Sequence, residues 1–124
     1  LEVVDGDAVR DWLDARDAAR MVLALADRRR GGDGGEPIEV CSGVGRSVRA
    51  IAEALVAAAG VSIDVVEATG GAGSDRSSAI RSVVGDPRRL RDLIGEEASP
   101  RFAFERTIAD LWRARGIEGS DAVS

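Results

Sequence analysis

The stretch from Ile38 to Val48 constrains the fold most, because an apolar run there ends in a glycine-rich turn that leads directly into a helix. Residues 36–41 alternate as in a strand, and Ser47 is a preferred helix N-cap residue. The helix after it has one apolar face, and Gly60 stands where a left-handed residue commonly ends a helix. The apolar face consists of Val48, Ile51, Ala52, Leu55, Val56 and Ala59. The sequence therefore predicts a strand, a tight turn and a helix in succession.

A second helix is predicted from Ala15 to about Arg29, with Asp14 as its N-cap residue. Asp17 in the first turn suits the helix dipole. We expect one apolar face of this helix to be buried. That face consists of Ala15, Ala18, Ala19, Val22, Leu25 and Ala26. Residues 28–30 are three arginines, and a solvated helix end is a simpler interpretation of them than an anion site.

Shorter elements complete the pattern. Extended segments are predicted at residues 1–9 with a break at residues 5–7, at 9–13, from 61 to 66 or 67, and at 81–84. A third helix is predicted after Asp86, with Leu90, Leu93 and Ile94 facing inward and Gly95 at its end. A fourth helix is predicted from about 103 to 115. Residues 68–79 are predicted to be a long loop, and 116–124 a frayed tail. This order favours a single α/β domain over residues 1–124, a small mixed domain of short strands and about four helices.

Composition limits the chemistry that the chain can perform. All 17 basic residues are arginines, and histidine and tyrosine are absent. The usual general bases and imidazole metal ligands are therefore missing. A net charge of −5 argues against a nucleic-acid partner, and the single cysteine excludes an internal disulfide bond.

The ends of the chain and its hydropathy bear on its location. No apolar run is long enough to predict a membrane span, and the first residues do not resemble a signal peptide. We therefore expect a cytoplasmic protein with no membrane partner. Because the chain does not begin with Met, we expect a fragment or a trimmed product.

Four arginines and Ser42 are the candidate binding residues. The arginines are Arg10, Arg46, Arg76 and Arg81. Because a guanidinium group can bind a phosphate through two parallel hydrogen bonds, we interpret them as contacts for one anionic ligand. Gly43 and Gly45 form half of a dinucleotide-binding fingerprint, but Val48 occupies the third glycine position. The turn is thus either a phosphate cradle or only a tight turn.

Other chemically active residues have simpler structural interpretations. Cys41 has no histidine to activate it, so we expect a small buried residue. Trp12 and Trp112 are expected in the core rather than as stacking platforms. Three aspartates could suggest a metal site, but helix capping and surface charge explain them more simply. These are Asp11, Asp14 and Asp17.

Four stretches resemble motifs of one enzyme family, in the order that the family has. Residues 9–19 (VRDWLDARDAA) resemble RDFxDVRDVA, and residues 39–48 (EVCSGVGRSV) resemble YNVGSGxxxSV. Residues 84–90 (VGDPRRL) resemble VGDPSKLR, and residues 104–113 (FERTIADLWR) resemble LEETLxDxxxWxR. The family is that of the extended short-chain dehydrogenases, the NAD-dependent epimerase/dehydratases. The Cys-Ser-Gly form of the turn is similar to that of GDP-mannose 4,6-dehydratases.

The resemblance implies a C-terminal, nucleotide-sugar-binding lobe without the Rossmann domain. In the family, an arginine of the first motif and one in a later loop contact the nucleotide diphosphate. The first corresponds to Arg10. The second corresponds to Arg76, with Arg81 as its rival, because the prolines and aspartate of the family's RPxDxP element are missing here. The glycine fingerprint and the Tyr-x-x-x-Lys pair are also missing, so the chain alone would bind no cofactor, whereas a full-length parent enzyme would use NAD(P).

Two functional hypotheses stay open. The first is a substrate-binding lobe that cannot catalyse alone, either a fragment or the partner of a separate Rossmann chain. The second is a repurposed, non-enzymatic lobe that self-associates or binds another protein through its exposed docking face. We expect a nucleoside diphosphate sugar as ligand and a homo-oligomer. An independent enzyme that uses carboxylates such as Asp75 or Asp86 has no specific support.

Overall fold

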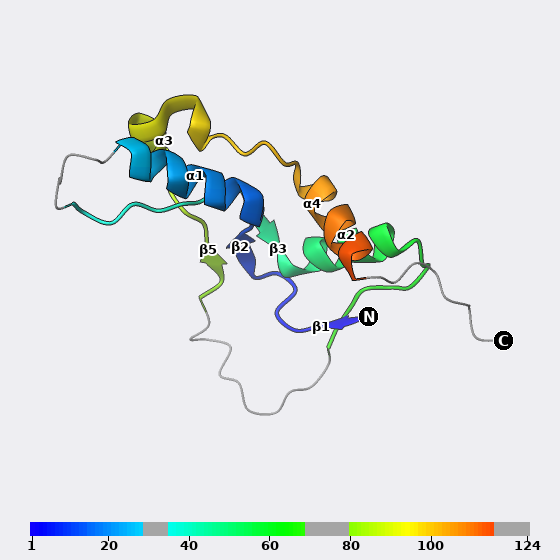
Figure 1. The fold of residues 1–124 in the computed structure, drawn as a ribbon. Helices are drawn as coiled ribbons and strands as arrows, with labels where there is room; N and C mark the ends of the chain where they lie inside the picture. The colour runs from blue at the N-terminus through cyan, green and yellow to red at the C-terminus, as the bar shows by residue number, and fades with distance from the viewer. Residues whose placement is uncertain (29–34, 69–79, 116–124) are drawn as a thin grey trace.

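Short strands and four α-helices make up the computed structural model, which describes residues 1–28, 35–68 and 80–115. In chain order the elements are β1 (Glu2–Val3), β2 (Val9–Asp11), α1 (Ala15–Arg28), β3 (Gly45–Ser47), α2 (Val48–Ala59), β4 (Val66–Glu67), β5 (Ser82–Val83), α3 (Arg88–Ile94), the 3-10 helix η1 (Gly95–Ala98) and α4 (Phe104–Ala114). Helices α1 and α3 lie side by side, as do α2 and α4, and β2 and β3 lie between the two pairs (Figure 1). The predicted small mixed α/β fold is confirmed.

Strand β2 is the centre of the larger sheet, which has the order β3–β2–β5. It pairs antiparallel with β3, so that Arg10 stands opposite Arg46 and Asp11 stands opposite Gly45. It pairs in parallel with β5, with Val9 and Arg10 in register with that strand. Strands of two or three residues position a few side chains but cannot hold a domain together by themselves.

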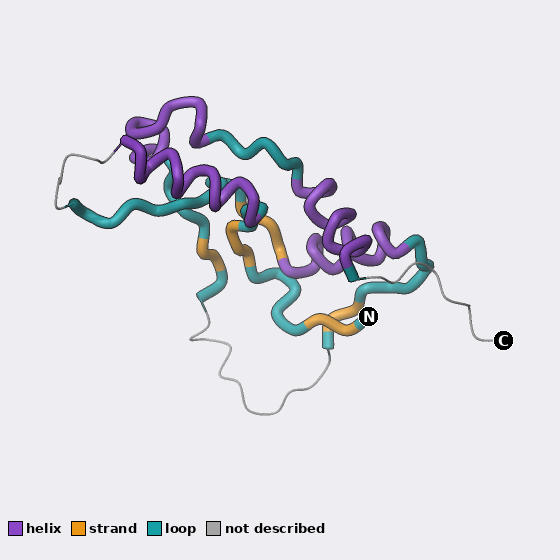
Figure 2. Tube along the Cα trace, viewed as in Figure 1, coloured by secondary structure: helices purple, strands orange, loops and turns teal. Residues whose placement is uncertain are grey.

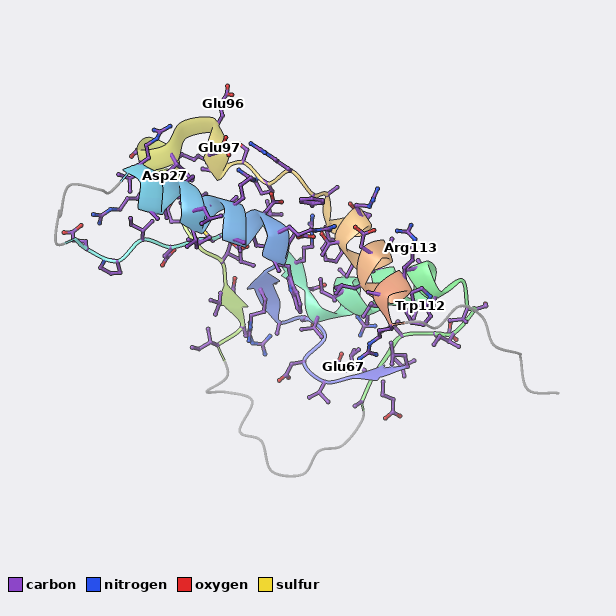
Figure 3. All side chains as sticks on the ribbon, viewed as in Figure 1. Asp27, Glu67, Glu96, Glu97, Trp112 and Arg113 are labelled. Atoms are coloured by element: carbon purple, nitrogen blue, oxygen red, sulfur yellow. The ribbon has the colours of Figure 1, made fainter. Side chains whose placement is uncertain are left out.

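A second, parallel sheet of β1 and β4 joins the N-terminus to the segment after α2. The terminal ammonium group of Leu1 donates to the carbonyl of Asp64 at 2.8 Å. The Glu67 carboxylate accepts hydrogen bonds at 3.2 Å from the N–H of Gly6 and from the side chain of Arg49, which lies on α2 (Figure 3). These contacts fix the first residues of the chain against α2.

Helix α2 has the end residues that the sequence predicts. The Ser47 hydroxyl accepts the N–H of Ala50 at 3.1 Å, and Gly60 adopts a left-handed conformation with φ of 67°. Ile51 and Ala52 of its apolar face are buried. The N-cap and the C-terminal glycine are therefore confirmed.

The buried core lies between α1 and α3. It contains Met21 of α1, Leu90 and Ile94 of α3, and Ala98 of η1, all at most 2% exposed. Leu90 and Ile94 point inward as predicted, and Gly95 with φ of 60° ends α3 at the predicted position. Because the fully buried cluster is small, polar contacts must supply much of the remaining cohesion.

The predicted buried face of α1 is wrong. Of that face only Leu25 packs against the core, whereas Val22 is 52% exposed, and Leu23 beside it is 68% exposed. The inward face instead carries Met21 and Asp17, both fully buried. The remaining exposed members of the predicted face are Ala15, Ala19 and Ala26.

The carboxylate of Asp17 explains this rotation of α1. It accepts the backbone N–H groups of Arg101 and Phe102 at 2.9 Å each, and a guanidinium N–H of Arg20 at 2.9 Å. Burial raises the pKa of Asp17, but these three hydrogen bonds outweigh burial and hold that pKa below its usual value. Asp17 is therefore an internal anchor between α1 and the segment before α4, and its interpretation as surface charge is wrong.

Two predicted strands do not form as expected. Residues 35–44 are a loop that runs alongside α1 (Figure 2), and the strand predicted at 61–66 is reduced to β4, which begins at Val66. A strand requires a hydrogen-bonded neighbour, and the described chain supplies none for these segments. Ile38 and Val40 nevertheless pack against the core, so the alternation does identify side chains that point inward.

Some predicted features lie outside the described residues. These are most of the loop predicted at 68–79, the tail 116–124, and two of the three arginines at 28–30. Within the described ranges, no helix is long and apolar enough to cross a membrane.

Replacing Asp17 by alanine is expected to lower the free energy of unfolding by about 3 kcal/mol, because two backbone N–H groups and Arg20 lose their buried acceptor. The control Asp92→Ala removes an exposed carboxylate of α3 and should change that free energy by less than about 0.5 kcal/mol. Urea unfolding followed by circular dichroism measures both variants. Equal effects of the two substitutions would contradict the anchoring role of Asp17.

Candidate functional site

The carboxylate of Asp11 organises the turn that leads into α2. It accepts the N–H and the hydroxyl of Ser42 at 3.0 and 2.6 Å, and the N–H of Gly43 at 2.8 Å. It also accepts the N–H of Gly85, which lies shortly before α3, at 3.2 Å. One side chain at the end of β2 thus holds two loops that are distant in the sequence.

The glycines of this turn serve packing. Gly43 has φ of 75°, and a Cβ atom there would lie 2.8 Å from the ring of Pro87. A Cβ atom at Gly45 would lie 2.6 Å from a side chain of the neighbouring strand β2. Because the N–H groups of Ser42 and Gly43 already donate to Asp11, the turn does not fit the pyrophosphate of a dinucleotide cofactor. These contacts favour the interpretation as a tight turn.

Cys41, just before the turn, is buried. Burial raises the pKa of its thiol, and the negative charges of Asp11 and Glu39 raise that pKa further. Burial also opposes ionisation of Asp11, but hydrogen bonds from Ser42, Gly43 and Gly85 hold the pKa of Asp11 below its usual value. Cys41 therefore remains a protonated thiol at neutral pH, as expected of a small buried residue.

Arg10 and Arg46 stand opposite each other on the ladder between β2 and β3. Directly opposite residues of an antiparallel pair share one face of the sheet, and like charges in that position repel. Arg10 donates from Nη1 to the carbonyl of Val9 at 2.7 Å and to that of Arg81 at 3.5 Å. Within residues 1–28, 35–68 and 80–115, neither guanidinium group contacts a carboxylate. Two arginines without a carboxylate partner among the described residues therefore stand opposite each other on this sheet.

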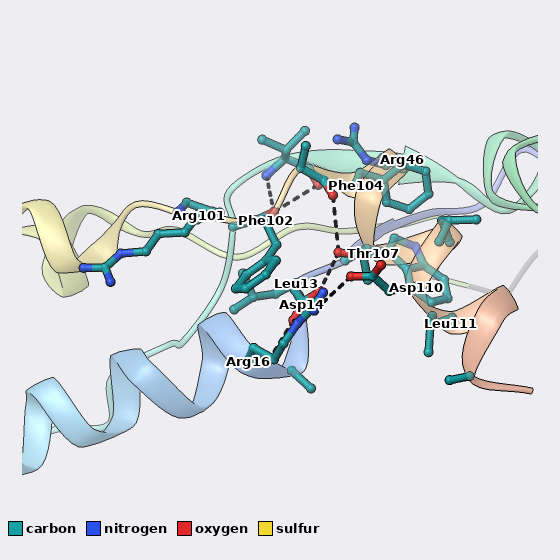
Figure 4. Close-up of a pocket in the computed structure, with 18 residues that line it drawn as sticks. Leu13, Asp14, Arg16, Arg46, Arg101, Phe102, Phe104, Thr107, Asp110 and Leu111 are labelled. Atoms are coloured by element: carbon teal, nitrogen blue, oxygen red, sulfur yellow. Dashed lines mark hydrogen bonds and ion pairs between the residues drawn. The ribbon is translucent and has the colours of Figure 1, made fainter. Parts of the chain in front are cut away.

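A cavity of about 770 Å³ opens beside this arginine pair, between the start of α1, the glycine turn and α4 (Figure 4). Ser42 and Arg46 line the cavity from the turn, and Thr107 lines it from α4. Its aromatic lining consists of Trp12, Phe102 and Phe104. An apolar, concave site with a few polar groups is the usual form of a small-molecule site.

Two guanidinium groups in the cavity lie over aromatic rings. Arg46 is 4.5 Å from the centroid of the Phe104 ring, and Arg16 is 3.7 Å from that of Phe102. These cation–π contacts orient each guanidinium group and leave its N–H edge available for hydrogen bonds. Arg46 is thus held in place with donors that a ligand can use.

Arg16 uses its donors inside the protein, where it ties α1 to α4. Its guanidinium group lies 2.7 Å from Asp14 and 2.9 Å from Asp110, and the Thr107 hydroxyl donates to Asp14 at 2.6 Å (Figure 4). The Arg16 bond, and then that of Thr107, outweigh burial and hold the pKa of Asp14 well below its usual range. Asp14 also accepts the N–H of Arg16 at 2.8 Å, which confirms its predicted capping role.

The early aspartates have structural roles in the described chain. Asp11 holds the turn, Asp14 caps α1, and Asp17 anchors that helix. In the part of the chain that the structure describes, no group of three or more potential ligands could hold a metal ion.

The structure brings three predicted binding residues together at the larger sheet. Arg10 faces Arg46, and Arg81 supplies its backbone carbonyl to Arg10 while its own side chain is exposed. Ser42 lines the cavity, but its hydroxyl donates to Asp11. The fifth residue, Arg76, lies outside the described residues.

Sequence reasoning missed the residues that α4 and its preceding segment contribute. Phe102 and Phe104 line the cavity because a hydrogen bond to Asp17 anchors the segment after η1 to α1. No local sequence pattern predicts this long-range contact. The expectation that Trp12 lies in the core is wrong, because its side chain is 46% exposed at the cavity wall. Its position two residues after Arg10 is the pattern that could have identified it.

Comparisons with known proteins identify relatives of the chain. No family model matches it. The UDP-glucose 4-epimerase of Caenorhabditis elegans is 33% identical over 114 residues, which are 90% of this chain and 31% of that protein. The GDP-6-deoxy-D-mannose reductase of Pseudomonas aeruginosa is 34% identical over 118 residues, 93% of this chain and 36% of that protein.

A solved structure agrees with these relatives. The structure of RMD from Pseudomonas aeruginosa complexed with NADPH has a TM-score of 0.70 to this chain and 32% sequence identity, and the match covers 93% of this chain and 35% of that one. The chain thus spans about a third of the length of the proteins that it matches. Over that third the chain is similar to a sugar epimerase and a sugar reductase, a partial match that agrees with the predicted extended short-chain dehydrogenase, epimerase/dehydratase family.

Proposed function

We propose that this chain is the nucleotide-sugar-binding lobe of an NAD(P)-dependent sugar epimerase, reductase or dehydratase, and that it does not catalyse alone. The observation that carries this proposal is the pairing of Arg10 with Arg46 beside an aromatic cavity. The diphosphate binds at the two guanidinium groups, and the cavity takes the uncharged part of the ligand.

The charges around the arginine pair support an anionic ligand. Several arginines of the described chain form ion pairs with carboxylates, as Arg20 does with Asp17 and Arg16 does with Asp14. Arg10 and Arg46 instead stand opposite each other in the strand register, and like charges in that position are unfavourable until an anion compensates them. A diphosphate supplies that anion and accepts bidentate hydrogen bonds from each guanidinium group.

The size and lining of the cavity suit the rest of such a ligand. A volume of about 770 Å³ is within the range of small-molecule sites, and aromatic and apolar side chains form much of its wall. Both sequence relatives are named for nucleotide sugars, one with UDP and one with GDP. A GDP sugar, as in GDP-mannose 4,6-dehydratases, stays a prediction from the Cys-Ser-Gly turn.

Cofactor and catalysis are assigned to a part of the enzyme outside this chain. The glycine turn does not fit a dinucleotide, and the chain has no tyrosine or lysine for the proton transfer of the family. A Rossmann half, within a longer polypeptide or as a separate chain, would bind the NAD(P) that the family uses. This lobe would hold the nucleotide sugar against that half. The cytoplasmic location stays a prediction.

The exposed apolar face of α1 supports the proposal that a Rossmann half packs against this lobe. The same face is also compatible with the alternative, a non-enzymatic lobe that self-associates or binds another protein. Val22 and Leu23 are more than half exposed, with small alanines on the same surface. Because the relatives have about two thirds of their length beyond the matching segment, that remaining part is the occupant that we propose for this face. Without it, exposed apolar surface favours self-association.

Removing either opposing guanidinium group should weaken nucleotide binding. We expect Arg46→Ala and Arg10→Ala each to reduce the affinity for GDP by about ten- to a hundredfold, or about 1.5–3 kcal/mol, because each removes a charge-assisted phosphate contact. Titration calorimetry with GDP measures this loss. The control Arg88→Ala removes the same charge from an exposed site on α3 and should leave the affinity unchanged. A folded wild-type chain that binds no GDP would refute the proposal.

Disrupting the exposed face of α1 should change the oligomeric state of the isolated chain. We expect the wild type to have a mass above that of its 13.0 kDa monomer in multi-angle light scattering, and Leu23→Glu to shift it to the monomer. Val61→Glu, at another exposed apolar residue after α2, is the control and should not dissociate the oligomer. A wild type that stays monomeric would contradict this use of the face, whereas a tight dimer that binds no GDP would favour the interaction module.

A further inference from the structure

The three aromatic side chains of the cavity differ in what covers their rings. The guanidinium group of Arg16 lies 3.7 Å from the centroid of Phe102, and that of Arg46 lies 4.5 Å from the centroid of Phe104. Trp12 has no such cover in the described chain and is 46% exposed at the cavity wall. Of these three rings, Trp12 therefore offers the face that remains open to a ligand.

Trp12 lies close to the proposed diphosphate site. It directly follows β2, the strand that carries Arg10, and it lines the same cavity as Arg46. Arg10 is the register partner of Arg46 and stands two residues before Trp12 in the chain. The cation pair and the open aromatic ring thus occupy adjoining parts of one surface.

A nucleoside diphosphate combines the two groups that this surface would bind. Its charged oxygens suit guanidinium groups, and its planar base suits stacking on an indole ring. Base stacking on aromatic side chains tolerates any base, because every base has a π face. It also removes from water the apolar indole surface that the free protein leaves exposed.

We propose that Trp12 is the stacking platform for the nucleobase of the ligand, while Arg10 and Arg46 hold its diphosphate. This inference rests on the proposed nucleotide-sugar function and adds the group that anchors the base. It also predicts that the lobe recognises the nucleotide largely through stacking, so that UDP and GDP both bind.

Binding to the full 124-residue chain tests the role of Trp12. Titration calorimetry compares the wild type with Trp12→Leu and Trp12→Phe, using GDP, mannose 1-phosphate and inorganic pyrophosphate as ligands. We expect Trp12→Leu to weaken GDP binding about tenfold and Trp12→Phe to retain most of the affinity. Binding of pyrophosphate, which has no base, should be the same in all three proteins. Circular dichroism confirms that each variant is folded.

Fluorescence gives a second readout that a purely structural role would not produce. In Trp112→Phe, Trp12 is the only tryptophan, and Trp112 does not line the cavity. We expect GDP to quench Trp12 fluorescence in this variant, whereas pyrophosphate should bind without quenching.

Three results would overturn the inference in distinguishable ways. If Trp12→Leu binds GDP as tightly as the wild type while Arg46→Ala does not, the diphosphate site stands and the stacking role is wrong. If mannose 1-phosphate loses as much affinity as GDP does, the indole ring contacts the sugar and not the base. If neither GDP nor pyrophosphate binds the folded wild type, the proposed function fails and the role of Trp12 fails with it.

Discussion

The carboxylate of Asp11 is the interaction on which the candidate site depends. It accepts hydrogen bonds from Ser42, Gly43 and Gly85, and so it joins the end of β2 to the turn before β3 and to the loop before α3. The sheet has strands too short to fix their own register, so this link determines which residues meet across it. The opposition of Arg10 and Arg46 follows from that register, and the cavity opens beside it.

The distribution of polar contacts separates charges with structural partners from those that we propose to bind a ligand. The Asp17 carboxylate accepts hydrogen bonds from backbone N–H groups before α4. The Arg16 guanidinium group forms ion pairs with two carboxylates. These links replace some of the cohesion that a larger apolar core would provide. Arg10 and Arg46 take no part in such pairs within the described residues, although the chain as a whole is acidic. Their remaining donors are the basis on which we propose an anionic ligand.

Local sequence patterns predicted the features that depend on interactions between neighbouring residues. The caps Ser47 and Asp14, and the terminal glycine Gly60, depend on neighbouring residues and were found from the sequence. The buried face of α1 could not be found, because Asp17 turns it toward amides more than 80 residues away. A strand at 36–41 requires a partner strand that the described chain does not supply. The aromatic wall of the cavity likewise depends on how α4 returns to α1, so Arg10 and Arg46 were predicted but their surroundings were not.

Nuclear magnetic resonance signals of the arginine Nε–H groups and of the backbone N–H groups test most directly where an anion binds. They distinguish binding at the arginine pair from binding at the glycine turn. The decisive measurement is a titration of the nitrogen-15-labelled chain with inorganic pyrophosphate. The largest shifts should occur at the Nε–H groups of Arg10 and Arg46, while the N–H groups of Ser42 and Gly43 stay unchanged because Asp11 already binds them. Dominant shifts at Ser42 and Gly43, or none at either arginine, would contradict this assignment of the site.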